Sequence, residues 1–591
     1  MYYKLLISSF MFSVTISAAD IEVKTSSGIS SSYSNSGILN WDDIPYAKPP
    51  IGNLRWKAPR EITYSENLLL PKDNNFCVQR PSGMGGSEGE GYFSGTEDCL
   101  YLDIKAPKNS SNKQLPVMFW IHGGGNTSGL KDLYDFSKMV KRHDVIVVSI
   151  NYRLGPFGWF THPAIQGLQS GLDKTSNFGT LDIIEALKWV QSNISLFGGD
   201  PKNVTIFGES AGGHNVFSLL ASKEAKGLFH KAISQSGYTT SIDKKSAYKQ
   251  DTNSPTSNHS TYNIVSRILK QKLIVNDQES IDTNDLNNLL LGLSSEEFFS
   301  FYADRPSYEE IPLSTADGVV IPIIGLSKAL GSKDYLNIVP TIAGSNRDEV
   351  KLWLGSAEYF VDLKFSPMGK LLGIPKVSLK DEEAFEIFNR YRSSAWKLRG
   401  VDGPLISMKE AGNENLFAYR YDWDDHRRFI VGDFKKLIGA AHATEIPLLT
   451  GNNKLVGDYG FLIYPRGPSK KFTSKNMMRF WTNFAKEGVP GNSTNSVEWS
   501  SYNTSNESNF IILDNRASLQ MSSDNISFEL LVADLLTETK VTVLEKCVIL
   551  LQMLTFVGDD LYDNYASPFS GSCNRTSAEK FLKDNASFID Y

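Results

Sequence analysis

The sequence predicts an α/β fold with a large, mostly parallel central sheet flanked by helices. Apolar runs of strand length, apolar on both faces, are typical of parallel strands that helices cover on both sides. Four such runs occur, at residues 117–121, 145–150, 204–207 and 339–343. Between them, Leu181 to Ile194 and Ala211 to Ala221 carry apolar side chains at helical spacing. This alternation of strand and helix predicts the α/β class.

The composition is that of an ordinary globular protein and excludes several kinds of partner. Of the 591 residues, 41% are apolar and 21% are charged, and the formal net charge is -6. Nucleic acid is not an expected partner, because its phosphates require basic patches. No histidine has a metal-ligand spacing, and no glycine-rich phosphate loop occurs. We therefore expect neither a metal nor any other cofactor.

The first nineteen residues have the pattern of a signal peptide. Lys4 supplies a positive charge, residues 5–16 are largely apolar, and Ser17-Ala18-Ala19 offers small residues for cleavage. The apolar stretch is shorter than the roughly 20 residues that span a bilayer. A buried N-terminal strand is the alternative. We expect a secreted protein, extracellular or periplasmic, with cleavage near Ala19 and one domain over residues 20–591.

Four cysteines in an exported chain favour two disulfides. Cys77 and Cys99 bracket a glycine-rich segment, and Cys547 and Cys573 lie near the C-terminus, so pairing neighbours is the simplest of three connectivities. Free buried thiols are the alternative. Cys547 lies in an apolar stretch, residues 541–557, that a Glu-Lys pair interrupts. This stretch predicts a packed helix, and no integral membrane segment is expected.

The element Gly208-Glu209-Ser210-Ala211-Gly212 predicts a nucleophilic serine. It follows an apolar strand and precedes a helical pattern, which is the context that a G-x-S-x-G nucleophile requires. The sharp turn lifts the hydroxyl of Ser210 into a cleft, and the helix N-terminus behind it offers N–H groups to negative charge. An unreactive turn serine is the alternative.

A glycine-rich loop follows the first apolar run, at His122-Gly123-Gly124-Gly125. Three glycines expose backbone N–H groups and allow a substrate to come close. Such donors stabilise the negative charge of a tetrahedral intermediate, which predicts an oxyanion hole. A plain glycine turn is the alternative, and we expect His122 to hold the loop rather than to take part in catalysis.

These motifs together resemble the type-B carboxylesterases, the family that includes the cholinesterases and several fungal lipases. Residues 197–212 match its serine signature position for position, and residues 97–104 resemble its second signature. Lys105 departs from that pattern, because the family usually has an apolar residue there. The resemblance covers nearly all of the mature chain, most weakly from about Thr239 to Leu336. It implies an α/β-hydrolase fold with a mixed central sheet and a carboxylic ester hydrolase.

The resemblance also implies the remaining members of the site. The oxyanion donors would be the N–H groups of Gly124, Gly125 and Ala211. Independently of the resemblance, we expect Glu209 to shape the electric field of the site, because it stands beside the nucleophile; a surface turn position is the alternative.

A serine nucleophile needs a general base and an orienting carboxylate, which follow it in α/β-hydrolases in the order acid, then histidine. This order excludes the earlier histidines, and His259 lies in a polar stretch, which leaves His426 and His442. His442 lies in a small-residue loop that resembles the family's H-x-x-E block, whereas His426 lies in a charged segment that we interpret as a solvated turn. Residues 344–349 resemble the G-x-N-x-D-E block, whose Glu has the catalytic role. We therefore predict Glu349 as the acid, although residue patterns alone do not separate it from Asp348.

The predicted substrate is a small-molecule carboxylic ester, but not a choline ester. Cholinesterases hold the cation on a Trp inside the first disulfide loop, and no Trp lies between Cys77 and Cys99. Asn126 stands where cholinesterases have an aromatic residue after the glycines. Two alternatives stay open: a lipase for long-chain acylglycerols, and a catalytically inactive adhesion protein like the neuroligin branch. The sequence decides neither the oligomeric state nor whether the first disulfide loop moves as a lid.

Overall fold

The fold is known from a computed structural model that describes most of the chain. The described residues are 21–35, 37–64, 66–83, 91–249, 260–274, 277–302, 311, 313–365, 376–429, 432–456, 460–503 and 509–585. The predicted signal peptide, residues 1–19, lies outside these ranges, as do residues 84–90 of the first disulfide loop. The division into a signal peptide and one domain over residues 20–591 therefore stays a prediction.

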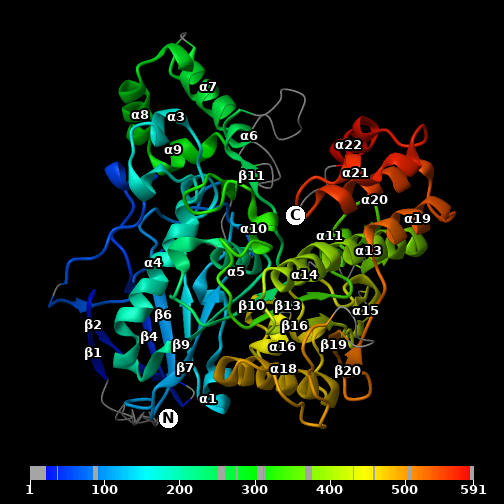
Figure 1. Cartoon of the computed structure of the whole chain (residues 1–591), viewed down its shortest axis with the longest axis horizontal. Coiled ribbons are helices and arrows are strands. Elements are labelled where there is room, and N and C mark those ends of the chain that lie inside the picture. Colours follow the sequence, from blue (N-terminus) through cyan, green and yellow to red (C-terminus); the bar gives the residue numbers. More distant parts are fainter. Residues whose placement is uncertain are drawn as a thin grey trace, which may run out of the picture.

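A mixed sheet forms the centre of the described part of the chain, as the predicted α/β class requires (Figure 1). Its eleven strands, in spatial order, are β20 (Gln520–Ser522), β19 (Phe510–Leu513), β16 (Leu416–Tyr421), β13 (Thr341–Asn346), β10 (Lys231–Gln235), β9 (Gly199–Glu209), β7 (Leu115–Ile121), β8 (Ile146–Ile150), β6 (Tyr101–Pro107), β4 (Ile38–Pro45) and β3 (Tyr33–Asn35). The pairs from β19 to β8 are parallel, and the pairs at both edges are antiparallel. The four predicted apolar runs correspond to β7, β8, β9 and β13.

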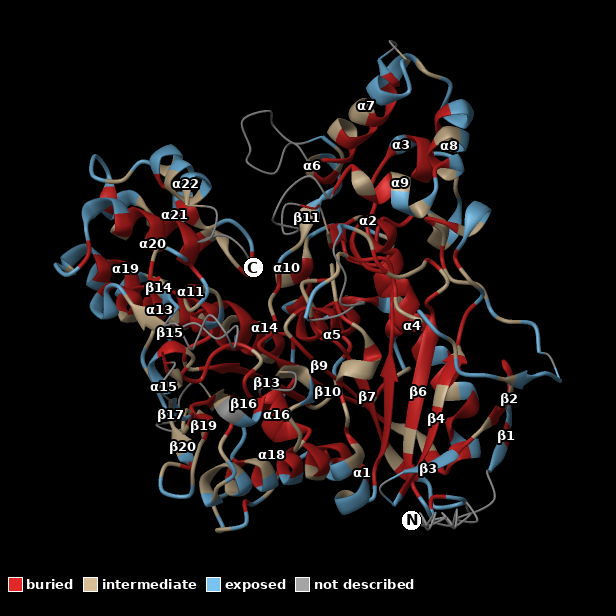
Figure 2. Ribbon diagram, turned by 180° about the vertical axis from the view of Figure 1, so that it is seen from behind, coloured by how far each residue is buried: buried red, intermediate tan, exposed pale blue. Residues whose placement is uncertain are grey.

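Strand β7 shows how the two faces of the sheet are covered. Val117, Phe119 and Ile121 point into a core with helices α4 (Phe178–Asn193) and α5 (Ala211–Ala221). Met118 and Trp120 point to the opposite face, into a core with α1 (Ser137–His143) and α18 (Pro468–Glu487). Because side chains alternate along a strand, an uninterrupted apolar run fills both cores at once. Figure 2 shows this central part of the sheet largely buried.

Two helical groups project from the sheet (Figure 1). The first packs around its own aromatic core and comprises α3 (Pro163–Gln166), α7 (Thr261–Gln271), α8 (Thr283–Gly292) and α9 (Ser295–Ser300). The second, which we call the C-terminal helical group, shares a separate core and comprises α11 (Lys351–Leu354), α13 (Glu382–Lys397), α19 (Phe528–Thr537), α20 (Val543–Thr555) and α22 (Arg575–Asp584). Helix α20 is the packed helix predicted over residues 541–557.

Shorter elements connect these parts. The helices are α2 (Gly155–Gly158), α6 (Lys244–Tyr248), α10 (Leu326–Leu330), α14 (Gly403–Glu410), α15 (Phe434–Leu437), α16 (Ile446–Leu449), α17 (Gly460–Ile463) and α21 (Tyr562–Tyr565). The strands are β1 (Glu22–Thr25), β2 (Gly28–Ser31), β5 (Leu68–Leu69), β11 (Ile242–Asp243), β12 (Thr315–Ala316), β14 (Val361–Lys364), β15 (Lys376–Leu379), β17 (Arg428–Phe429) and β18 (Gly432–Asp433). No helix in the described ranges is both long enough and apolar enough to cross a membrane.

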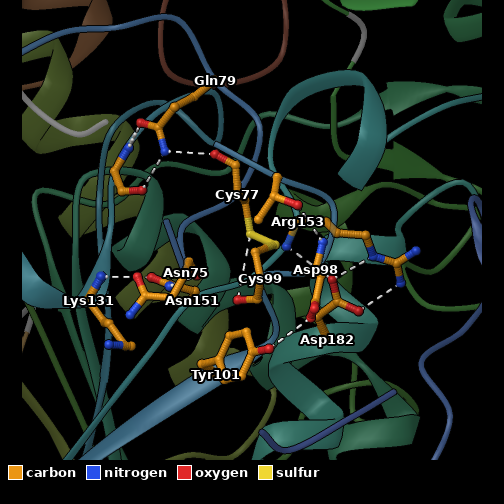
Figure 3. The surroundings of a disulfide bond; sticks show 12 residues. Asn75, Cys77, Gln79, Asp98, Cys99, Tyr101, Lys131, Asn151, Arg153 and Asp182 are labelled. Carbon is orange, nitrogen blue, oxygen red and sulfur yellow. Dashed lines mark hydrogen bonds and ion pairs between the residues drawn. A yellow bond between two sulfur atoms is a disulfide. The ribbon is translucent and has the colours of Figure 1, made fainter. Parts of the chain in front are cut away.

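Both predicted disulfides are present, Cys77 with Cys99 and Cys547 with Cys573. Figure 3 shows the first of them and its surroundings. Next to it, the Gln79 amide donates to the carbonyl of Gly129 and accepts from its N–H, at 3.0 and 2.9 Å. These bonds join the base of the disulfide loop to the segment that follows the glycine loop of residues 122–125.

A buried ion cluster lies close to the same disulfide. The ammonium of Lys131 is fully buried and lies 2.8 Å from the carboxylates of both Asp43 and Asp103. Burial raises the pKa of Asp103 to about 7, although Lys131 opposes the shift. Because Asp43 lies in β4 and Asp103 in β6, the cluster fixes the segment between β7 and β8 to the antiparallel edge of the sheet. The backbone N–H of Lys131 also donates to Asn151, which follows β8 (Figure 3).

Candidate active site

Ser210 occupies a sharp turn between β9 and α5. Strand β9 ends at Glu209 and helix α5 begins at Ala211, so one residue makes the whole reversal, with φ 58° and ψ -121°. A side-chain-bearing residue adopts such angles only when its surroundings enforce them. The N–H of Ser210 donates to the carbonyl of Gln235, and its carbonyl accepts from His214, both at 2.9 Å. The half-buried side chain is therefore held in one direction by strand β10 and helix α5.

The two glycines of the motif are required by space. A Cβ at Gly208 would lie 2.6 Å from the backbone of Gly212, and a Cβ at Gly212 would collide with the carbonyl of Ile121. Real side chains do not tolerate such contacts with backbone. The turn can form beside β7 only if both positions lack a side chain.

The glycine loop lies directly against the nucleophile. A Cβ at Gly123 would lie 3.1 Å from the Cβ of Ser210. Gly124 and Gly125 have φ values of 100° and 62°, which glycine adopts without strain. Among the described residues, the N–H groups of Gly124, Gly125 and Ala211 find no hydrogen-bond acceptor. The three predicted oxyanion donors are thus unpaired beside Ser210, free to bind an anionic oxygen.

The side chain of His122 packs against this loop. Its ring is fully buried, stacks on Tyr152 at a centroid distance of 4.5 Å, and lies 2.8 Å from the carbonyl of Gly123. Burial lowers the pKa of His122 to about 4, so the ring is neutral at physiological pH. This position agrees with a structural role for His122.

His442 and Glu349 come together from two different loops. His442 lies between α15 and α16, and Glu349 follows β13. Nδ1 of His442 lies 2.7 Å from Oε2 of Glu349, and the N–H of His442 donates to the carbonyl of Glu349 at 3.0 Å. The other carboxylate oxygen accepts from the N–H of Asn346 at 2.7 Å. Glu349 therefore fixes the orientation of the imidazole, which is what a triad carboxylate does.

The competing carboxylate, Asp348, faces away from His442. It accepts from the N–H of Ala440 at 2.9 Å and from Asn389 at 2.7 Å, and it forms an ion pair with Arg347. Burial opposes ionisation, but the guanidinium of Arg347 outweighs it and holds the pKa of Asp348 below its usual range. Asp348 is a structural carboxylate that ties the loop after β13 to the loop that carries His442.

The competing histidine, His426, also lies elsewhere, but not as predicted. The interpretation of its segment as a solvated turn is wrong, because only 7% of His426 is exposed. Its Nε2 lies 2.8 Å from the carbonyl of Gly439, and its ring packs edge-on against Trp423 and Tyr464. The charged residues on both sides of His426 in the sequence led to this wrong prediction, because its own side chain is buried.

Glu209 places a second carboxylate at the other side of the imidazole. It is 2% exposed, and its Oε1 lies 3.1 Å from Nε2 of His442. Neither of these two atoms makes a hydrogen bond, and none joins the Ser210 hydroxyl to Nε2. Catalytic hydrogen bonds are often loose before substrate binds. The nitrogen that would accept the serine proton thus faces Glu209, the residue directly before Ser210, and makes no hydrogen bond.

The charges of this cluster shift the pKa values of its members. Burial raises the pKa of Glu209 to about 8, against the opposing effect of His442. Burial alone would lower the pKa of His442, but the carboxylates of Glu209 and Glu349 outweigh it and raise this pKa to about 9. Burial also raises the pKa of Glu445, which lies nearby. The site holds more acidic groups than its one imidazolium can balance.

Several supporting residues were not predicted from the sequence. Glu445 accepts from the side chains of Asn346 and Gln235, at 2.7 and 3.1 Å, and so links the acid loop to the strand that anchors Ser210. Trp353 and Trp396 pack against the ring of His442, with centroids 5.0 and 4.8 Å away. Asn346 lies in the motif that contains Glu349, and Glu445 lies in the motif that contains His442, so their positions in these motifs could have identified them. No sequence motif indicated that the two tryptophans belong to the site.

Comparison with known proteins gives one consistent result. The model of the family described as the carboxylesterase family matches residues 19–365 and 404–529. A para-nitrobenzyl esterase of Bacillus subtilis (strain 168) is 31% identical over 503 residues, covering 80% of this chain and 91% of that protein. A cocaine esterase of Homo sapiens is 37% identical over 491 residues, covering 77% and 80%. Residues 366–403 and 530–591 lie outside the family match.

Solved structures agree with the sequence comparison. A PNB esterase aligns with a TM-score of 0.63 at 28% identity, covering 85% of this chain and 96% of that one. A carboxylesterase of Geobacillus stearothermophilus aligns with the same TM-score at 27% identity, covering 87% and 99%. The described sheet and helices therefore have the α/β-hydrolase fold that the sequence predicts.

Proposed function

Since this chain belongs to the carboxylesterase family and is a carboxylic ester hydrolase, we propose that its reaction passes through an acyl-enzyme formed on Ser210. The observation that supports this most directly is the 2.7 Å contact between Nδ1 of His442 and Glu349. It favours the tautomer in which Nε2, the nitrogen on the side of Glu209, is free to accept the proton of Ser210.

In the first half of the reaction, Oγ of Ser210 attacks the ester carbonyl carbon while Nε2 of His442 takes the hydroxyl proton. The carbonyl oxygen becomes an anion and is bound by the N–H groups of Gly124, Gly125 and Ala211. The tetrahedral intermediate then collapses. His442 returns the proton to the departing alkoxide, and the acyl group stays on Ser210 as an ester.

The second half repeats these roles with water. His442 removes a proton from water, the hydroxide adds to the acyl carbon, and the same N–H groups bind the new oxyanion. The C–O bond to Ser210 breaks, the carboxylic acid leaves, and the proton returns to the serine oxygen. Each half requires neutral His442, so the reaction depends on the balance of charge around Glu209 and Glu349.

Covalent labelling tests this proposal. A fluorophosphonate probe should label the wild type and the variant Ser218→Ala, but not Ser210→Ala. Ser218 is a matched control because it is a buried serine on the same helix whose hydroxyl makes no hydrogen bond. Intact mass after a short exposure to p-nitrophenyl acetate should show one acetyl group on the two labelled proteins. Equal labelling of Ser210→Ala and the wild type would refute the assignment of the nucleophile.

The acyl-chain preference separates an esterase from a lipase. We propose small, soluble esters as substrates, so kcat/KM on p-nitrophenyl esters should fall as the acyl chain grows beyond a few carbons. Activity that stays high on long-chain acylglycerols, and rises at an oil–water interface, would favour the lipase instead. A wild type that no fluorophosphonate labels would favour the adhesion protein.

We also propose that the enzyme is exported. The pattern of residues 1–19 and the two disulfides support this, because disulfides persist in oxidising compartments. Expression of the full chain in its native type of host, followed by N-terminal sequencing of the exported protein, should give a chain that begins at Asp20. Recovery of the activity inside the cell with residues 1–19 attached would contradict the proposal.

A further inference from the structure

We propose that Asn126 and Asn215 act together as a latch that holds the glycine loop at a fixed distance from the nucleophile helix. The inference rests on the proposed function, because the latch acts through the oxyanion donors and touches neither the substrate nor the reacting atoms. Both are positioning residues, and their effect is on the transition state.

The latch is a single, fully buried hydrogen bond. Nδ2 of Asn215 donates to Oδ1 of Asn126 over 2.8 Å. Asn126 is 1% exposed and Asn215 is not exposed at all. Water does not compete for a bond at this depth, so its loss leaves a buried acceptor poorly satisfied. Oδ1 of Asn215 makes no hydrogen bond, and its amide lies against Asn126 and the hydroxyl of Tyr152.

The position of the latch gives it a role in the oxyanion hole. Asn126 directly follows Gly125 in the loop, and Asn215 lies one helical turn after Ala211 in α5. The hole needs donors from both elements, because Gly124 and Gly125 belong to the loop and Ala211 to the helix. The strands that lead into these two elements, β7 and β9, are neighbours in the sheet. Beyond the strand ends, the latch is a side-chain hydrogen bond that joins the loop to the helix next to the donors.

Hydrogen bonds within the loop close the segment that holds Asn126 and the loop's two oxyanion donors, so a displacement of Asn126 would also displace Gly124 and Gly125. The carbonyl of Gly124 accepts from the N–H groups of Thr127 and Ser128, at 3.0 and 2.9 Å, which closes the loop on itself. The carbonyl of Asn126 accepts from Gly155 at 2.7 Å. The loop is therefore one compact unit, and the side-chain hydrogen bond that joins it to α5 is made by Asn126.

The residue type at position 126 fits both requirements of the latch. Its φ of 59° follows two glycines that also have positive φ. Asparagine is among the few residues with a side chain that adopt this region readily. Glycine would satisfy the backbone but would lose the acceptor, and an aromatic residue would lose both the acceptor and the bond to Asn215. The Tyr152 hydroxyl, at 3.3 Å from Oδ1, is a second and longer contact.

The experiment removes one side of the latch at a time and keeps the backbone conformation on each side. Asn215→Leu deletes the donor with little change in size, and Asn126→Gly deletes the acceptor and keeps the positive φ. Both variants and the double variant are assayed with p-nitrophenyl acetate for kcat and KM. They are also assayed with a trifluoromethyl ketone, whose hemiketal places an anionic oxygen in the hole. Ser218→Ala on the same helix is the control.

The latch predicts a specific pattern. Each single variant should lose about 10- to 100-fold in kcat, less than the loss of a whole oxyanion donor, with KM changed less than about twofold. The Ki of the ketone should rise by the factor by which kcat/KM falls. The double variant should be no worse than the more impaired single variant, because both remove the same bond.

Other results overturn the inference. Additive losses in the double variant, a rise in KM at constant kcat, or an unchanged Ki would each mean that the pair supports the fold and not the hole. A low melting temperature alone does not produce the matched change in kcat/KM and Ki, so that correlation separates the two roles. If Ser210→Ala keeps full activity, the proposed function itself fails and the latch fails with it. If Ser210 is labelled but both latch variants keep their kcat, only the latch fails.

Discussion

The clearest prediction concerns Glu209, whose removal should change the pH at which the enzyme becomes active. The variant Glu209→Gln keeps the shape of the side chain and removes its charge. Oε1 of Glu209 lies 3.1 Å from Nε2 of His442, and its charge favours the protonated imidazole. Only the neutral imidazole can accept the proton of Ser210. A raised pKa therefore places the loss of activity, as pH falls, at a higher pH than an ordinary histidine would.

The size of the shift follows from the distance. Two unit charges 3.1 Å apart interact with about 5 kcal/mol at an effective dielectric constant of about 20, which is about 4 pKa units. The observed shift will be smaller, because burial raises the pKa of Glu209 itself to about 8, so this carboxylate is partly protonated over the pH range of the limb. We expect the acid limb of kcat/KM to lie near pH 9 in the wild type and about 1 to 2 units lower in the variant.

The assay is a pH profile of kcat/KM on p-nitrophenyl acetate, with the rate of fluorophosphonate labelling as a second reading of the same ionisation. The plateau of Glu209→Gln should fall below that of the wild type, because the imidazolium formed in the transition state loses a stabilising charge. Glu209→Asp is the matched control, because its shorter side chain keeps the charge but places it farther from His442. The acid limb of this variant should lie between those of the wild type and Glu209→Gln. An acid limb at the same pH in all three proteins would refute the assignment of the His442 shift to Glu209.

Three further predictions follow from the geometry. Glu349→Gln should lower kcat by about 10⁴-fold with little change in melting temperature, whereas Asp348→Asn should lower the melting temperature and keep most of kcat. Gly212→Ala should prevent folding to an active state, because its Cβ would collide with backbone, and circular dichroism with activity in the soluble fraction measures this. Removal of the Cys547–Cys573 disulfide by a double change to alanine should cost about 3 kcal/mol in urea unfolding, since it closes a 26-residue separation.

Each of these has a control or a contrary result. Equal losses of kcat in the Glu349 and Asp348 variants would mean that the two carboxylates do not have separate roles. Gly292→Ala is the control for Gly212→Ala. A Cβ at Gly292 would meet nothing within 4 Å, so this variant should stay active. An unchanged urea midpoint without the second disulfide would show that the C-terminal helical group needs no covalent link.

The elements that the sequence predicts well are those in which one local requirement dominates. The four apolar runs had to be strands covered on both faces, and the helix at Ala211 to Ala221 has the bounds that its spacing predicts. The same is true of the G-x-S-x-G motif, because the turn at Ser210 leaves no room for side chains at its two glycine positions. Residue types that geometry demands can be found in a sequence.

Contacts between distant segments could not be found in this way. Nothing in the pattern around His426 indicated that its ring is buried, because the charged residues beside it point elsewhere. The bond between Asn126 and Asn215 joins residues 89 positions apart, and asparagine is common in turns for unrelated reasons. The choice between Asp348 and Glu349 required the direction of two adjacent side chains, which only the surrounding fold determines.

The C-terminal helical group has a consequence for how this enzyme relates to others of its family. Helix α13 lies in the unmatched stretch 366–403, and α20 lies in the unmatched stretch 530–591, yet both pack into one core. A change in the apolar face of either helix alone would remove part of the surface against which the other packs. The two stretches should therefore be inherited as a single module, and a chimera with a relative should fold only if both are exchanged together.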